Sequence, residues 1–195
     1  GVNKALVLAG SPTKAVGDFE SSMDLLSTGL YEKYRFKEIF CAGHPEGNKD
    51  IDPKGTDKNL IAALKWKNNF FMQTKTEWSL TTQFCFELAP IKIWENRLRE
   101  EGIKVPINIG VAGPAKLQTM IKYAIMCGVG PSIKVLEKRA KDLTKLLLPY
   151  SPDKLLTELS DYKQKNKNSN VRSIHFFPLG GIEKTTDFIS RLNKV

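Results

Sequence analysis

The stretch SLTTQFCFE, residues 79–87, decides the fold prediction for this chain. It has the apolar content of a buried strand, but Thr81, Thr82 and Gln83 interrupt it near the carboxyl end. A buried parallel strand is normally a nearly continuous apolar run, so these polar side chains need hydrogen-bond partners. Ligands of α/β sheets and barrels bind at the carboxyl ends of the strands. The stretch therefore predicts either a ligand contact at Gln83 or a glutamine satisfied by neighbouring backbone.

Strands and helices alternate along the rest of the chain. Apolar runs predict strands at 5–10, 36–43, 105–111 and 171–177. Helical periodicity predicts helices at about 19–34, 56–71, 89–102, 116–127, 132–148, 151–162 and 182–192. We expect Asp18 and Thr56 to cap the first two helices, Gly102 to end the third, and Ser151 to cap the sixth, with residues 163–170 as a solvated loop. The pattern predicts a single domain, residues 1–195, with a mostly parallel sheet and right-handed crossovers.

Two architectures fit this order of elements. One is an open five-stranded parallel α/β sheet with helices on both faces. The other is a partial (β/α)8 TIM barrel, whose complete form typically needs about 250 residues, so that three units would precede this chain. Periodicity does not choose between them.

Composition excludes several classes of protein. The formal charge of +9 is spread over helices and loops, so we expect no nucleic-acid partner, although an anionic small ligand suits the charge. No run approaches the roughly 20 apolar residues of a membrane helix, and residues 1–8 do not resemble a signal peptide. Cys41, Cys85 and Cys127 are far apart, without the spacing of a metal site, which predicts reduced thiols in a cytoplasmic protein.

Short motifs at the strand ends resemble the methylenetetrahydrofolate reductase family, in family order. AGHPEGN, residues 42–48, is similar to its Pro-Glu flavin loop, and TQFCFE, residues 82–87, to its Thr-Gln-aromatic motif. LAG at 8–10, IGVAGP at 109–114 and HFF at 175–177 with Gly180-Gly181 are similar to the ends of its fourth, seventh and eighth strands. The resemblance implies that the chain is the carboxyl-terminal part, strands 4 to 8, of a flavin-binding barrel in a divergent branch.

The resemblance also implies a site. FAD would be held by residues matching the family's flavin contacts, which are Ala9, Gly10, Ser11, His44, Asn48 and Lys67. Folate would be held by Gln83, Thr119 and Tyr123. The implied activity is reduction of 5,10-methylenetetrahydrofolate to 5-methyltetrahydrofolate with NAD(P)H, a step of one-carbon metabolism and methionine biosynthesis. His175 is expected to have a structural role.

The sequence departs from the family pattern in ways that keep alternatives open. Ser11 stands where the family has an acidic residue near the flavin ring, and Thr119 stands where it has a glutamine. The first departure motivates an alternative, a folate-binding protein of one-carbon transfer that does not reduce its ligand. A second alternative is an open α/β module unrelated to folate. The family's catalytic acid lies on strand one, so we expect this part to be inactive alone and prone to form a homo-oligomer through its strand edges.

Overall fold

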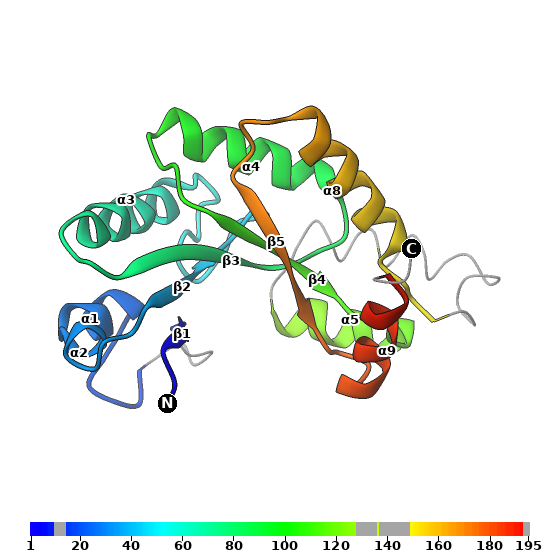
Figure 1. The fold of residues 1–195 in the computed structure, drawn as a ribbon, viewed down its shortest axis with the longest axis horizontal. Coiled ribbons are helices and arrows are strands. Elements are labelled where there is room, and N and C mark those ends of the chain that lie inside the picture. Colours follow the sequence, from blue (N-terminus) through cyan, green and yellow to red (C-terminus); the bar gives the residue numbers. More distant parts are fainter. Residues whose placement is uncertain (10–14, 128–135, 137–148, 193–195) are drawn as a thin grey trace.

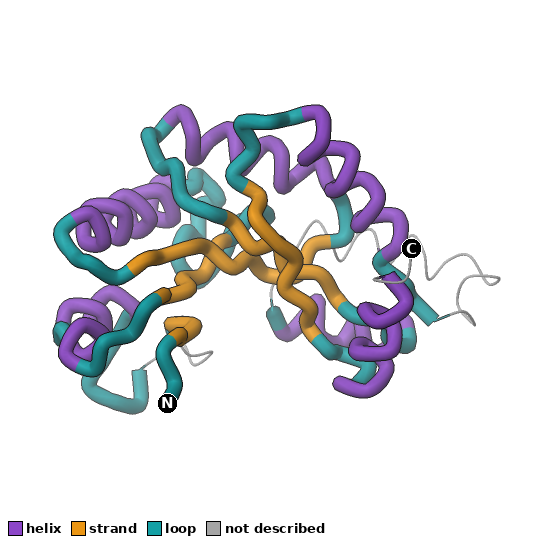
Figure 2. Tube along the Cα trace, viewed as in Figure 1, coloured by secondary structure: helices purple, strands orange, loops and turns teal. Residues whose placement is uncertain are grey.

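A computed structural model shows an α/β protein built on one parallel sheet, and it describes residues 1–9, 15–127, 136 and 149–192 (Figure 1). The strands are β1 (Lys4–Val7), β2 (Glu38–Gly43), β3 (Glu77–Cys85), β4 (Ile107–Ala112) and β5 (Val171–Phe177). The helices are α1 (Ser22–Ser27), α2 (Leu30–Lys33), α3 (Lys58–Met72), α4 (Leu88–Glu100), α5 (Leu117–Met126), α8 (Asp153–Lys165) and α9 (Ile182–Leu192). The alternation of strands and helices confirms the predicted class (Figure 2).

The five strands lie side by side in chain order, β1-β2-β3-β4-β5, and every neighbouring pair is parallel. Each connection therefore crosses to the next strand in the same direction. Because such crossovers are right-handed, helices of successive units are placed on the same face of the sheet.

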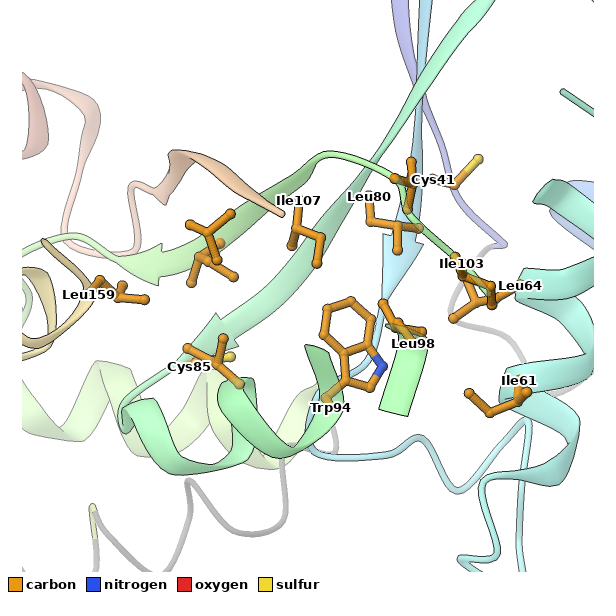
Figure 3. Close-up of a cluster of buried hydrophobic side chains, with 14 of the residues drawn as sticks. Cys41, Ile61, Leu64, Leu80, Cys85, Trp94, Leu98, Ile103, Ile107 and Leu159 are labelled. Carbon is orange, nitrogen blue, oxygen red and sulfur yellow. The ribbon is translucent and has the colours of Figure 1, made fainter. Parts of the chain in front are cut away.

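One large apolar cluster joins that face to helices α1, α3, α4 and α8. Figure 3 shows Trp94 and Leu98 of α4 lying against the strand residues Leu80 and Ile107. Leu98, Leu80 and Ile107 are fully buried. Successive side chains of a strand point to opposite faces of the sheet. The strand residues of this cluster lie on one face, which is apolar, and the residues between them lie on the other face, which is polar.

A second apolar cluster lies at the carboxyl ends of β3 and β4. It packs Phe84 and Phe86 with the buried side of α5, which presents Leu117 and Met120. In the same region Gly180 lies so close to Pro114 that a Cβ atom on it would be 2.0 Å from the Pro114 carbonyl oxygen. The loops that follow β4 and β5 are therefore in close contact.

The first predicted helix was wrong both in its start and in its continuity. The helix expected over 19–34 is divided into α1 and α2, because Gly29 has φ 70°. Ser21 caps α1, not Asp18: its Oγ accepts the Asp24 N–H at 3.3 Å, while the Asp24 carboxylate accepts the Ser21 N–H at 2.7 Å. This reciprocal pair satisfies two backbone donors at the helix start.

Other helix boundaries also differ from the prediction. Thr56 does not cap α3; instead the buried carboxylate of Asp52 accepts from Thr56 and from the Asn59 N–H at 3.2 Å. Helix α8 begins after Pro152 rather than at a Ser151 cap, and it extends to Lys165, into the predicted loop. The helix predicted over 132–148 lies outside the described residues apart from Leu136.

Candidate ligand site at the carboxyl edge of the sheet

The predicted site residues His44 and Gln83 come from neighbouring strands. Gly43 of β2 and Thr82 of β3 are register partners. His44 and Gln83 are each one residue further along, so they reach the same carboxyl edge of the parallel sheet. A Cβ atom on Gly43 would lie 2.7 Å from the Trp94 ring, which fixes that strand end closely against α4.

Gln83 lies in an irregularity of β3. The pairing with β4 runs from Thr81↔Asn108 to Phe84↔Gly110, so Thr82 and Gln83 together oppose one residue of β4. Such a bulge locally interrupts the ladder and changes the direction of side chains. Gln83 is half-buried, whereas the residues on both sides of it are buried.

His44 has an unsatisfied polar atom. Its Nδ1 is shielded from solvent and has no hydrogen-bond partner among the described residues. Burial, reinforced by the positive charge of Lys67, lowers the pKa of His44 to about 4. The imidazole is therefore neutral at physiological pH, and its buried Nδ1 has an unused hydrogen-bonding position.

Lys67 is a buried cation whose charge acts on the His44 ring. It lies on the inward side of α3 and is only 6% exposed. Burial lowers the pKa of Lys67, and no carboxylate in the described part of the chain forms an ion pair with it. A buried ammonium without a paired anion is costly, so this position suits an anionic ligand group.

The cysteines near this edge have little thiolate character. Burial raises the pKa of Cys41 to about 11 and that of Cys85 to about 12, the latter helped by the charge of Glu46. The thiol of Cys85 donates to the Gln83 carbonyl at 3.4 Å, so it takes part in the bulge. The predicted burial is confirmed for Cys41 and Cys85, whereas Cys127 is half-buried.

The remaining predicted residues are more dispersed. Thr119 is half-buried and Tyr123 is 36% exposed, one turn apart on α5, whose buried side packs with Phe84 next to Gln83. The side chain of Asn48 closes its own turn by accepting from the Asp50 and Ile51 N–H groups. Ala9 is exposed, and Gly10 and Ser11 lie outside the described residues.

A polar network that sequence reasoning missed covers the other face of the sheet. Glu38 accepts from Arg172 at 2.6 Å, from Lys4 at 3.0 Å and from Ser79 at 3.1 Å, and Asn108 donates to Ser79 at 3.2 Å. Although burial alone would raise it, the hydrogen bonds from Arg172 and Lys4 hold the pKa of Glu38 below its usual value. The network takes one residue from each of the five strands. The sequence signal that could have predicted this network is the presence of charged residues at the starts of the predicted strands.

The network borders a hollow of about 560 Å³. Its lining includes Phe40, Thr81 and Ser173 as well as His175, which packs edge-on against Phe177. Neither His44 nor Gln83 lines it. The charged members of the network lie at the amino ends of the strands, whereas ligands of open α/β sheets bind at the carboxyl ends, so we assign the network to the scaffold.

Comparison with known protein families gives no match to any family model. Within the described ranges, no three His, Cys, Asp or Glu side chains are grouped to hold a metal ion. No helix of the described residues has the length and apolar character to span a membrane.

Proposed function

We propose that this chain is the carboxyl-terminal part of a flavin-binding (β/α)8 barrel. The order of the strands supports this proposal, because open nucleotide-binding sheets reverse their strand order at a switch point, whereas a barrel keeps chain order throughout. The polar face also supports it, because in the described part of the chain this face borders an open hollow, whereas all-parallel sheets normally have both faces covered.

An ion pair that reaches across the sheet supports the same proposal. Arg172 of β5 bonds directly to Glu38 of β2. Three strand spacings of about 4.8 Å would separate β2 from β5 by roughly 14 Å in a flat sheet, so both side chains would have to lie fully stretched across β3 and β4 to meet. A sheet that curls toward its polar face, as one closing into a barrel does, brings the two side chains together without such stretching.

The proposed activity is reduction of 5,10-methylenetetrahydrofolate to 5-methyltetrahydrofolate with NAD(P)H. The observation that carries it is the convergence of the His44 loop and Gln83 at one edge of adjacent strands. These are the two motifs whose joint presence is the most specific part of the resemblance, and they are 39 positions apart in the sequence.

The residues present fit a flavin cofactor. The buried, unpaired Nδ1 of His44 suits a hydrogen-bonding heterocycle, and the uncompensated charge of Lys67 suits a phosphate. FAD, when bound, supplies the hydride chemistry. The protein's own residues bind and orient: His44 and Lys67 hold the cofactor, the amide of Gln83 reads the pterin edge, and Tyr123 with Thr119 borders the folate.

A second candidate is a folate-binding protein that does not reduce its ligand. Ser11 favours it, because the family's carboxylate near the flavin ring is missing from the sequence at that position. Charge near the ring tunes a flavin's electronics, so its loss would lower reductase activity without removing the folate contacts.

One experiment separates these functions. The full-length protein is purified, its visible flavin absorbance is recorded, and NADH or NADPH is added without oxygen, followed by 5,10-methylenetetrahydrofolate. A reductase is yellow, is bleached by the nucleotide and regains its colour with the folate. A colourless protein that binds folate supports the second candidate. A protein that binds neither flavin nor folate overturns both.

A further inference from the structure

The hydroxyl of Thr82 forms a side-chain bridge between β3 and β4 at the bulge. It accepts the Gly110 N–H at 2.8 Å and donates to the Gln83 carbonyl at 2.7 Å. Regular parallel strands are joined by backbone bonds, so a side-chain bridge of this kind is specific to the irregular stretch. Thr82 is 1% exposed, so water does not compete for these bonds.

The bridge fixes the backbone of Gln83 in a turned position. The Gln83 carbonyl bonds to the side chains of Thr82 and Cys85, at 2.7 and 3.4 Å. It is thus held from both sides by residues of its own strand. The peptide after Gln83 has little freedom to rotate while both bonds are present.

Gly110 makes the bulge sterically possible. A Cβ atom at this position would lie 2.3 Å from the Thr82 carbonyl oxygen and 2.6 Å from that of Gln83. Both are backbone atoms that cannot move aside, so the close approach requires glycine. Beyond the bulge, Phe84 is buried and packs edge-on against Phe86 and Phe177, which anchors the strand again.

We infer that Thr82 and Gly110 are positioning residues, which act through Gln83 to set recognition of the pterin. Bulges are common beside functional sites, where they re-aim one side chain. The hydroxyl bridge makes this bulge a defined conformation. The inference rests on the proposed function, because it assumes that the Gln83 amide contacts a heterocycle bearing amide-like donors and acceptors.

The test compares Thr82→Val with Thr82→Ser in the full-length protein. Valine keeps the shape but removes the hydroxyl, whereas serine keeps the hydroxyl. Affinity for 5-methyltetrahydrofolate, affinity for FAD and stability in urea are measured for each, with Gln83→Leu as the reference for loss of the amide.

We expect Thr82→Val to weaken folate binding about tenfold, with FAD affinity changed less than about twofold, and Thr82→Ser to bind folate nearly as the parent does. Equal losses of folate and FAD affinity in Thr82→Val would mean a merely structural role and would overturn the inference. If Thr82→Val keeps full folate affinity while Gln83→Leu loses folate affinity, the inference about Thr82 is overturned and the proposed function is not. Full folate affinity in Gln83→Leu overturns the proposed pterin contact as well.

Thr82→Cys provides a second variant if valine prevents folding. The thiol is a weak hydrogen-bonding group of similar size, so folate affinity should fall several-fold while FAD affinity is retained. Unchanged folate affinity in this variant contradicts the bridge.

Discussion

Gly43 and Thr82 are register partners in adjacent parallel strands, and this pairing brings His44 and Gln83 to one edge of the sheet. The two residues belong to separate motifs in the sequence. Because the strands are parallel and follow chain order, each crossover returns the chain to the same end of the sheet. Residues far apart in the sequence are therefore neighbours at that end. The pairing is the structural basis for treating the two motifs as one site.

Stability should depend on His44 in weakly acidic solution. Its pKa is about 4 in the folded protein and 6.5 as the ordinary value, so the unfolded chain binds more protons between these limits. Stability contributed by the neutral ring is therefore present above pH 6.5 and is lost as the pH falls. Between pH 6.5 and about 5 the loss is about 2 kcal/mol in the free energy of unfolding.

His44→Leu should remove most of this pH dependence, measured by urea unfolding at several pH values. His175, whose pKa burial also lowers, is the other histidine and leaves a smaller slope. An identical slope in His44→Leu and the parent would contradict the burial of the His44 ring.

Gly110→Ala should destabilise the protein by about 1–3 kcal/mol, because the added methyl group meets two backbone oxygens at the bulge. Gly17→Ala is the matched control, since a Cβ atom there meets nothing within 4 Å. It should change the free energy of unfolding by less than about 0.5 kcal/mol. Equal stability of the two variants in urea would show that β3 and β4 do not approach so closely.

Lys67→Met should separate ligand binding from stability. Removing a buried charge without an ionic partner should leave the protein at least as stable, with a gain of about 1 kcal/mol. FAD affinity should fall about tenfold or more if the ammonium holds a phosphate. Lys58→Met, at an exposed position on the same helix, is the control and should bind FAD normally. A destabilised Lys67→Met with normal FAD affinity would give the lysine a structural role instead.

Tyr162→Phe should cost about 1–3 kcal/mol of stability. The fully buried carboxylate of Glu95 accepts the Tyr162 hydroxyl at 2.6 Å and also the Asn170 N–H, which ties α4 to α8 and to the start of β5. Removing the hydroxyl leaves a buried oxygen without its donor. The loss is measured by thermal unfolding. Tyr34→Phe, at a 65% exposed position, should have little effect on the melting temperature in that measurement. Equal melting temperatures for the two variants would contradict this link.

Local signals in the sequence predicted the strands and the later helices well. β5 and α9 match their predicted ranges, since each has strong periodicity and sharp flanking turns. The break at Gly29 was missed because glycine is tolerated within a helical pattern, and only its φ of 70° shows that the helix is interrupted. The Asp52 cap was missed because its carboxylate reaches α3 across seven residues, to the Asn59 N–H.

Features that depend on pairing between residues far apart in the chain could not be predicted from the sequence. The polar residues at 81–83 correctly indicated a need for partners, but the bulge depends on the register of β3 with β4. The contact between Glu38 and Arg172 joins positions 134 apart in the sequence, and it depends on how the strands between them are arranged. For the site, the sequence proposed His44, Lys67 and Gln83. The strand register that brings His44 and Gln83 to one edge, and the missing partner of His44 Nδ1, are seen only in the three-dimensional structure.

The most direct test of one shared site is a titration of the full-length flavoprotein with 5-methyltetrahydrofolate, followed through the flavin's visible absorbance. A folate held by Gln83 beside a flavin held by His44 should perturb that absorbance saturably, and Gln83→Leu should keep the flavin but lose the perturbation. A protein that binds this folate by calorimetry without any change in the flavin spectrum, or that carries no flavin, would contradict the account.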